Sequence, residues 1–411
     1  MKILHSVRKY HSSNGGMYEV VKQISENLAK NGHEITIATA PLPKKLPDTD
    51  NIKIAEFDIS GSLITGFKGE LEKYQDFLIN SDFDIITSFA AQQTMSDAMI
   101  PVLDKIKAKK IFVPTGFSAF YIPEYKEYFQ KMGIWMKQFD MNVFLSNDYR
   151  DINLARKNQV KNISIIPNGA SKKEFLAETI IDIREKLCIP NDNFLILHVG
   201  SHTAQKGHKE AIEIFKKAKL VDTTFLVVGN EGRCLGDCQK QEKKLNQSKS
   251  FKKNNKKIII IHLNREETVA AYKAASLFLF PSNIECSPVV LFECMAAKLP
   301  FLTTEAGNAK EIIKWSDGGL LLPTEHNILL GNYLITRTKK IIKKIIGRID
   351  NDYHFCKAEI NGSVKLLEKI YHNKEELKRL GENGYKAWDE KFNWEKISQD
   401  YEKLYLDLLK K

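Results

Sequence analysis

The sequence has no apolar run that could cross a bilayer, since none approaches the roughly 18 apolar residues that a membrane span needs. Its first residues, MKILHSVRKYHSSNGG, also lack the continuous apolar segment of a secretory signal. We therefore expect a cytoplasmic protein, whose contact with a membrane would be peripheral, at the inner face.

The sequence also lacks a regular spacing of cysteines. The six cysteines have no framework spacing, and Cys234 and Cys238 (CLGDC) lack the CxxC pairs and the histidines of a zinc site. We expect structural or free thiols and no metal.

With 411 residues, 43% hydrophobic and 27% charged, the composition is typical of a soluble enzyme with two domains.

Charge of one sign is in excess: the formal net charge is +11, and lysines concentrate at 240–257 and 338–349. The first segment has the composition of a solvated loop. The second, TKKIIKKIIGRI, alternates Ile and Lys pairs at helical spacing, so its apolar side packs either on its own domain or on an anionic membrane.

A nucleic-acid binder would need aromatic residues among the basic runs. The segment 240–257 offers only Phe251, so we expect that the protein does not bind nucleic acid.

Short apolar runs alternate with helical patterns, which predicts parallel sheets wound with helices. The expected strands of the first half are KILHSV, HEITIAT, DIITSFA, KKIFVPT, NVFLS and NISIIP. The pattern then restarts with FLILHVG, FLVVG, KIIIIHL, LFLFPS and PFLTTE. We predict two doubly wound units with the hinge near Pro167–Ser171, and ligands at the carboxyl ends of the strands.

The stretch Asn283–Pro300, NIECSPVVLFECMAAKLP, is mostly apolar yet carries two carboxylates. Ser287 is a good N-cap and Pro288 is favoured at the first helical position, so a helix is expected to begin there. The free amides of Val289 and Val290 would then form an anion site for a diphosphate.

Glu285 and Glu293 flank this predicted site, and ionised carboxylates are strong acceptors for hydroxyl donors. A nucleotide sugar has hydroxyls on both sides of its diphosphate, which would explain both residues. The stretch alone also fits a capping loop followed by one half-exposed glutamate.

Most of the chain resembles the retaining glycosyltransferases of family 4. The matching motifs are GGMYEVVKQISENLAKNGHEITIAT, IIPNGA, REKLCIP, FLILHVGSHTAQKG, FLVVGNEG, IIIIHLNREETVAAYKAASLFLFPS, IECSPVVLFECMAAKLPFLTTEAGNAKEI, GGLLLP and the closing ELKRLGENGYKAWDEKFNWEKISQDYEKLY. The match is poor from about 41 to 129 and in the two lysine-rich segments.

The resemblance implies the GT-B fold, an α/β architecture of two Rossmann-like domains facing a central cleft. Residues 1–170 would bind the acceptor and 171–391 the nucleotide sugar, with a final helix at about 392–411 packing back on the first domain. The expected donor is UDP- or GDP-linked, with no other cofactor. The acceptor would be a glycan or lipid-linked molecule in cell-surface polysaccharide or glycolipid synthesis.

Site roles follow from the resemblance residue by residue. Glu285 would contact hydroxyls of the donor sugar, Glu293 the ribose, and Lys206 the diphosphate. Gly229 would end a strand beside the nucleotide, Leu263 would lie where the backbone meets the base, and Gly15 and Gly16 would bring the N-domain loop to the phosphates and acceptor. For each glycine alone, an ordinary turn is the alternative.

Two departures from the family pattern stand out. Members usually carry Arg directly after the position of Gly200, where this chain has Ser201 followed by His202. Many also carry a cleft His where this chain has Thr115 and Gly116. Leaving-group stabilisation would then rest on Lys206, the helix amides and His202.

The implied mechanism retains configuration: the acceptor hydroxyl attacks from the face that the nucleotide leaves, and a donor phosphate oxygen takes its proton. The helix end and Lys206 would supply the positive charge that a metal otherwise provides. DxD sequences at Asp48, Asp82 and Asp350 could suggest a metal, but Asp82 precedes its predicted strand, at the wrong end for a ligand site.

A transferase has three alternatives on the same fold. An epimerase or phosphorylase on the same fold would need features that the sequence lacks, such as a pyridoxal phosphate lysine motif. A non-catalytic GT-B partner subunit is supported only by the missing Arg and His. A screen of nucleotide sugars for thermal stabilisation discriminates these readings.

Overall fold

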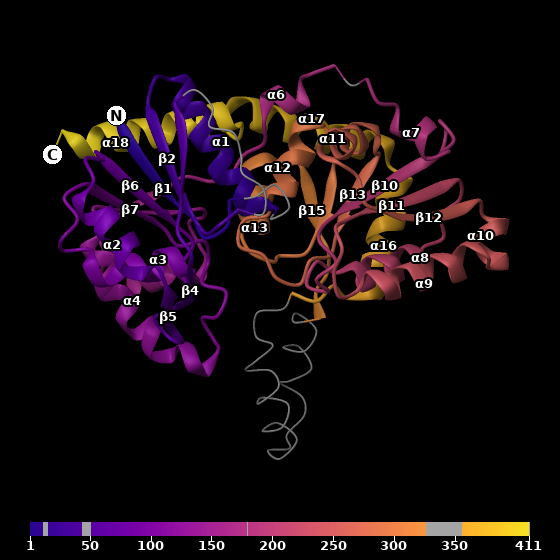
Figure 1. The fold of residues 1–411 in the computed structure, drawn as a ribbon. Coiled ribbons are helices and arrows are strands. Elements are labelled where there is room, and N and C mark those ends of the chain that lie inside the picture. Colours follow the sequence, from indigo (N-terminus) through magenta and orange to yellow (C-terminus); the bar gives the residue numbers. More distant parts are fainter. Residues whose placement is uncertain (11–14, 43–50, 179, 326–355, 411) are drawn as a thin grey trace, which may run out of the picture. The chain divides into compact units, whose positions relative to one another are not determined.

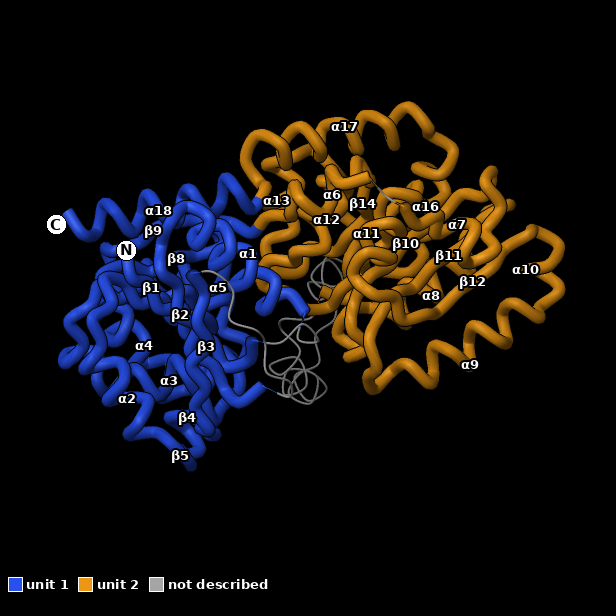
Figure 2. The backbone as a smooth tube through the Cα atoms, turned by 45° about the horizontal axis from the view of Figure 1, so that its top comes forward, with its two compact units in different colours: residues 1–168, 394–411 blue, residues 169–393 orange. Residues whose placement is uncertain are grey.

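The computed structural model describes residues 1–10, 15–42, 51–178, 180–325 and 356–410. The chain forms two compact units, which Figure 2 colours separately. Unit 1 comprises Met1–Asn168 and Trp394–Lys411, and unit 2 comprises Gly169–Asn393. The passage from one unit to the other therefore falls within Pro167–Ser171.

Unit 1 contains, in its described part, a seven-stranded parallel sheet of order β3-β2-β1-β6-β7-β8-β9. These strands are β1 (Lys2–Ser6), β2 (Glu34–Thr39), β3 (Ile52–Glu56), β6 (Ile85–Phe89), β7 (Lys109–Val113), β8 (Met141–Phe144) and β9 (Ile163–Ile165). A small antiparallel hairpin, β4 (Ile59–Ser62) with β5 (Gly66–Gly69), is separate from that sheet. The sequence motifs did not predict β3 or the hairpin.

Helices cover both faces of this sheet, because its central strands are apolar on both sides and a parallel sheet must be buried on both faces. The helices are α1 (Gly16–Lys30), α2 (Leu71–Asn80), α3 (Thr94–Met99), α4 (Lys126–Gln138), α5 (Arg150–Lys157) and α18 (Trp394–Leu409), with short 3-10 turns at Ile100–Val102 and Pro123–Tyr125. Leu4, Phe112 and Phe144 pack in one core with residues of α2 to α5.

The last helix, α18, belongs to unit 1 although its sequence follows all of unit 2 (Figure 1). It packs against α1, and Glu402 accepts bonds of 2.7 Å each from Asn31 and His33. Deeper in the core, the Tyr405 hydroxyl lies 2.7 Å from the Thr87 hydroxyl on β6, and both side chains are fully buried.

Unit 2 repeats the design with a six-stranded parallel sheet of order β12-β11-β10-β13-β14-β15 in its described residues. The strands are β10 (Phe194–Val199), β11 (Thr223–Val228), β12 (Lys256–Ile261), β13 (Leu277–Phe280), β14 (Phe301–Thr303) and β15 (Gly319–Leu321). The helices are α6 (Lys172–Phe175), α7 (Ile183–Lys186), α8 (His208–Lys217), α9 (Leu235–Asn246), α10 (Lys249–Lys253), α11 (Arg265–Ala274), α12 (Val289–Ala296), α13 (Ala309–Ser316), α16 (Ile360–Tyr371) and α17 (Lys374–Glu390).

Alternation along β10 separates the two cores of this unit. Leu195 and Leu197 pack with residues of α11, α12 and α13, whereas Ile196 packs with residues of α8, α9 and α16 on the other face. Successive side chains of a strand point to opposite faces, so the sheet lies between two helical layers (Figure 1).

One expectation was wrong: residues 240–257 are not a solvated loop, because they include most of α9, all of α10 and the start of β12. Leu245 and Phe251 are buried against the sheet. Lys256 is buried as well, and its ammonium donates to the carbonyls of Phe215 and Ala218 at 2.6 and 2.8 Å. The segment looks polar because its outward face is lysine-rich, while widely spaced apolar residues anchor it.

The remaining expectations concern the basic segment 338–349, the DxD sequences and membrane spans. Residues 338–349, Asp48 and Asp350 are outside the described residues, so the basic amphipathic segment and two of the DxD sequences have no structural outcome. Asp82 precedes β6 and forms an ion pair with Lys2. None of the described helices is long and apolar enough to span a bilayer.

Loss of one hydroxyl should test the attachment of α18. We expect Tyr405→Phe to lower the free energy of unfolding by about 1–3 kcal/mol, because the buried Thr87 hydroxyl then loses its hydrogen bond to Tyr405. The control Tyr371→Phe removes a 2.9 Å bond to the half-exposed Val221, where water replaces the hydroxyl, and should cost less than about 0.5 kcal/mol. Equal losses in urea denaturation would contradict this attachment.

Candidate functional site

The sheet of unit 2 has a switch point between β10 and β13, where the strand order reverses. Loops leaving two such strands at their carboxyl ends diverge and create a place for a ligand. Here the loop after β10, residues 200–207, is bonded to the loop after β13, residues 281–288. Asn283 N–H donates to the Gln205 carbonyl at 2.8 Å, and the Ser282 hydroxyl oxygen lies 3.2 Å from the same carbonyl oxygen.

Gly207 fixes the close approach of these two loops. It has φ +71°, and a Cβ there would lie 1.8 Å from the Pro281 carbonyl oxygen. Any other residue would be strained and would push the loops apart. The requirement explains the glycine directly after Lys206 and sets where that lysine stands.

Lys206 and Glu285 meet across the two loops. The ammonium donates to Glu285 Oε1 at 2.6 Å, and the Ser282 hydroxyl donates to the same oxygen at 2.7 Å. The Glu285 side chain is 8% exposed and that of Lys206 is 30% exposed. A buried carboxylate thus holds an accessible cation at the switch point, which is an arrangement that an anionic ligand can join.

Helix α12 starts beside this pair, one residue later than the sequence predicted. Pro288, not Ser287, occupies the N-cap position, and no side chain caps the helix. The first intrahelical bond runs from Leu291 N–H to the Pro288 carbonyl at 3.1 Å. The amides of Val289 and Val290 precede it and have no acceptor within the helix, as an anion site requires.

Glu293, one turn further along α12, is 4% exposed and paired rather than half-exposed. Arg265 donates to its Oε1 at 2.6 Å and to Glu174 Oε2 at 2.5 Å. Sequence reasoning missed Arg265, although a signal was present: it follows the capping residue Asn264 at the start of α11, directly after β12. The guanidinium and Glu293 together offer a donor and an acceptor to a ligand hydroxyl.

His202 is fully buried, unlike the half-exposed Ser201 beside it. Burial lowers the pKa of His202 below its usual value, so the imidazole is neutral at pH 7. Its Nδ1 lies 3.6 Å from Cys234 Sγ. In this structure the side chain therefore offers no positive charge in place of the missing Arg.

Gly229 directly follows β11 and lies close to the loop after β10: a Cβ there would lie 2.3 Å from the Gly200 carbonyl oxygen. Leu263 follows β12 and its side chain is 5% exposed. Both residues therefore lie just beyond the carboxyl ends of their strands, at the edge of the sheet where the loop after β10 also begins.

Unit 1 has its own switch point, between β1 and β6, and a hollow of about 350 Å³ lies there. Its lining comes from the ends of β1, β6 and β7 and from α1, namely Val7, Arg8, Lys9, Met17, Ala90, Ala91, Gln93, Pro114, Thr115, Phe117 and Ser118. Three residues of the lining, Ala90, Thr115 and Phe117, have φ of +67°, +56° and +51°. Such strained backbone is concentrated at functional sites.

Gly15 and Gly16 immediately precede Met17, a lining residue of this hollow. Gly15 has φ +69° and is the N-cap of α1, which begins at Gly16, next to the lining residue Met17. Thr115, which stands where many family members have His, is itself part of the lining.

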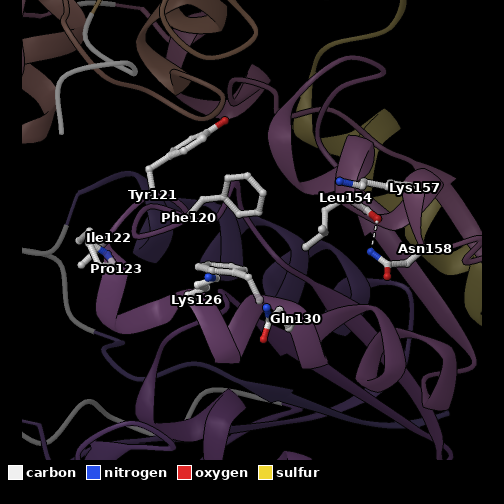
Figure 3. A pocket seen from close by; sticks show the side chains of 10 residues that line it. Phe120, Tyr121, Ile122, Pro123, Lys126, Gln130, Leu154, Lys157 and Asn158 are labelled. Atoms are coloured by element: carbon white, nitrogen blue, oxygen red, sulfur yellow. Dashed lines mark hydrogen bonds between the residues drawn. The ribbon is translucent and has the colours of Figure 1, made fainter. Parts of the chain in front are cut away.

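A second pocket of unit 1, of about 610 Å³, opens between α4, α5 and the turn before α4 (Figure 3). Its lining combines aromatic and apolar side chains with two lysines: Phe120, Tyr121, Ile122, Pro123, Lys126, Phe129, Gln130, Leu154, Lys157 and Asn158. Tyr121 and Ile122 are 44% and 45% exposed. This amphipathic lining was not anticipated from the sequence.

Residues 179–333 match the family model described as glycosyl transferases group 1. This region of the chain belongs to the family. Its members are retaining glycosyltransferases with the GT-B fold, and the two parallel sheets of this chain have that architecture.

Relatives agree with this assignment. An uncharacterised glycosyltransferase of Methanocaldococcus jannaschii is 22% identical over 87% of this chain and 90% of its own length. The N-acetyl-alpha-D-glucosaminyl L-malate synthase of Bacillus anthracis is 20% identical over 100% and 98%. The capsular polysaccharide biosynthesis glycosyltransferase CapM of Staphylococcus aureus is 22% identical over 63% and 58%.

Solved structures share the fold over nearly the whole chain. Sucrose-phosphate synthase of Thermosynechococcus elongatus superposes with a TM-score of 0.74 at 15% identity, covering 99% of both chains. The Anabaena protein HepE, solved in complex with UDP and glucose, superposes with a TM-score of 0.66 at 14% identity, covering 99% of this chain and 100% of its own.

Two further buried histidines support the β10 loop of this group 1 glycosyltransferase. His198 Nδ1 lies 2.8 Å from the Leu279 carbonyl and His208 Nε2 lies 3.2 Å from the Gly200 carbonyl. Burial is the main cause that lowers the pKa of His198 to about 4 and that of His208 to about 2. Both are therefore neutral donors at pH 7.

Acid should destabilise the protein through these side chains. Between about pH 6.5 and 4 the unfolded chain binds a proton at His198 that the folded chain excludes, so stability falls as the pH falls through this window, by roughly 3 kcal/mol for this residue. We expect His198→Asn to flatten the dependence of the unfolding free energy on pH, and exposed His372→Gln to leave it unchanged. An unaltered slope in His198→Asn would count against the assignment.

Proposed function

We propose that this glycosyltransferase moves a sugar from a nucleotide-sugar donor to an acceptor hydroxyl with retention of configuration, in the synthesis of a cell-surface glycan or glycolipid. The observation that carries the proposal is the meeting of Lys206, Glu285 and the start of α12 at the switch point of unit 2. A cation, a buried carboxylate and free amides together suit a diphosphate linked to a polyhydroxyl group.

On binding, the donor would replace the hydrogen-bond partners that Lys206 and Glu285 have in this structure. Its diphosphate would take the Lys206 ammonium and the Val289 and Val290 amides, and a sugar hydroxyl would donate to Glu285. The ribose hydroxyls would meet Glu293, which Arg265 already orients. The complex of HepE with UDP and glucose supports this class of donor on the same fold.

Leaving-group charge would rest on Lys206 and the helix amides alone. A charge-assisted hydrogen bond contributes roughly 1.5–3 kcal/mol, so absence of the usual Arg at Ser201 slows transfer without abolishing it. The neutral, buried His202 does not replace that charge in the structure as it stands. No protein base is required if a donor phosphate oxygen accepts the proton.

Unit 1 would supply the acceptor site. The hollow at its switch point carries Arg8 and Lys9, and the second pocket joins exposed Tyr121 and Ile122 to Lys126 and Lys157. Aromatic faces beside cations suit a glycan or a lipid-linked diphosphate, and would favour peripheral contact with an anionic membrane. The name of the capsular polysaccharide relative supports this class of acceptor.

A screen of nucleotide sugars tests the proposal. One nucleotide sugar should raise the melting temperature of the protein, because a ligand at 100 times its dissociation constant adds about 2.7 kcal/mol to the free energy of unfolding. The protein should also release nucleoside diphosphate slowly from this nucleotide sugar when no acceptor is present. If none is bound, hydrolysed or transferred, a non-catalytic partner subunit becomes the better conclusion.

Substitution of the two glutamates should separate sugar from nucleotide. We expect Glu285→Gln to spare binding of the free nucleoside diphosphate while it reduces turnover. Glu293→Gln should weaken nucleotide binding by about 1.5–3 kcal/mol, roughly ten- to a hundred-fold, because one acceptor oxygen and the charge facing Arg265 are lost.

Calorimetric titration with the cognate nucleoside diphosphate distinguishes the two variants, with Glu382→Gln on the exposed side of α17 as control. If affinity and turnover are the same in the wild type and all three variants, the two carboxylates are structural.

Charge reversal at the second pocket of unit 1 should affect the acceptor alone. We expect the double variant Lys126→Glu, Lys157→Glu to raise KM for an anionic acceptor about tenfold or more, because two attractive charges become repulsive. Donor affinity should stay unchanged. Lys131→Glu, on the same helix α4 but outside the lining, is the matched control, and equal KM values in both variants would place the acceptor elsewhere.

A further inference from the structure

Three side chains with soft or imidazole ligand atoms converge behind the loop of residues 200–207. His202 comes from that loop, Cys234 from the turn after β11, and Cys238 from the first turn of α9. The ligand atoms of all three lie within 4.8 Å of one another. The sequence gives no hint of this, because the histidine precedes the cysteines by more than thirty positions and follows a different strand.

We propose that His202, Cys234 and Cys238 form a binding site for a thiophilic divalent cation, zinc above all. Zinc is held by cysteine sulfur at about 2.3 Å and by histidine nitrogen at about 2.0–2.1 Å, and tetrahedral angles then put nitrogen and sulfur about 3.6 Å apart. His202 Nδ1 and Cys234 Sγ are 3.6 Å apart. The pair therefore already has the spacing that a shared ion requires.

Helix geometry brings the third ligand to the same place. Cys234 is the N-cap of α9, and Cys238 N–H donates to the Cys234 carbonyl at 3.0 Å in the first turn. Residues four apart on a helix share a face, so both sulfurs point the same way. The two cysteines supply a pair of ligands from one rigid element, and His202 supplies the third from another.

The site is enclosed and braced by backbone. His202 is fully buried and Cys238 is 3% exposed. Cys234 N–H donates to the His202 carbonyl at 3.1 Å, which ties the two segments together. A Cβ at Gly229 would lie 3.0 Å from the His202 ring, and one at Gly232 would lie 2.4 Å from the His202 carbonyl oxygen, so both glycines make room for this histidine.

The orientation of the histidine suits a metal ion shared with the cysteine. Within the described residues, its buried Nε2 has no hydrogen-bond partner, and its Nδ1 faces the cysteine sulfur. A neutral ring with its proton on Nε2 presents the Nδ1 lone pair to an ion. The half-exposed side of Cys234 leaves an entry path and a fourth position for water.

Metal binding would fasten the loop that ends in Lys206 to α9. The loop is held at one end by hydrogen bonds to the segment after β13 and at the other by the backbone bond from Cys234 to His202, and a bound ion would reinforce this second attachment through side chains. The site does not depend on the proposed function, because its ligands are neither Lys206 nor Glu285.

Cobalt binding to the metal-stripped full-length protein tests the site without reference to activity. We expect one equivalent of Co²⁺ to give a thiolate charge-transfer band and the visible bands of a tetrahedral ion, and one equivalent of Zn²⁺ to displace it. Zinc should also raise the melting temperature, as a ligand that binds only the folded state must.

Variants assign the ligands. Cys234→Ser, which changes a half-exposed position and should fold, and Cys238→Ser should each weaken zinc binding on the order of 100-fold in competition with a chromophoric chelator. Cys188→Ser, at an exposed cysteine elsewhere in unit 2, is the control and should bind as the wild type does. Absence of the charge-transfer band, or the same affinity in Cys234→Ser and Cys188→Ser, would overturn the proposal, as would recovery of Cys234 and Cys238 as a disulfide that takes up no metal after reduction.

Discussion

The ion pair between Lys206 and Glu285 is the contact on which the unit 2 site depends. Glu285 is nearly buried, and an ionised carboxylate in that position is tolerable only with a partner. Lys206 provides the partner, and it remains accessible enough to take another anion. The pair thus holds both charged groups at one point. In the proposed function, a nucleotide sugar would supply a replacement for each partner: phosphate in place of Glu285 and a hydroxyl in place of Lys206.

Strand order explains why the pair forms where it does. The loops that carry Lys206 and Glu285 leave neighbouring strands, β10 and β13, which are separated by about 80 positions in the chain. Gly207 allows these loops to touch, and α12 begins directly afterwards with free amides. In unit 1 the same topological feature, between β1 and β6, coincides with a hollow edged by strained residues. Each unit therefore has a distinctive feature at its own switch point: an accessible lysine beside a helix start in unit 2, and a hollow in unit 1.

Sequence reasoning succeeded where one short segment contains the whole signal. Continuous apolar runs such as FLILHV identify buried parallel strands, and SPVV identifies the start of α12 to within one residue. It failed where the decisive contact joins distant segments. Arg265 meets Glu293, and His202 meets Cys234 and Cys238, only once the strands β10 to β13 are paired in one sheet. Residues 240–257 were wrongly predicted to be a loop, because their many polar residues hide the signal of the two buried apolar residues, Leu245 and Phe251.

The most direct measurement concerns Lys206, once the screen has identified the donor. The initial rate of nucleoside diphosphate release should fall about 100-fold or more in Lys206→Met, the usual effect of removing one group that stabilises developing charge. Binding of the free nucleoside, which has no phosphate, should stay the same in both proteins. Equal rates of release in the wild type and Lys206→Met would contradict the assignment of the leaving-group site to this switch point.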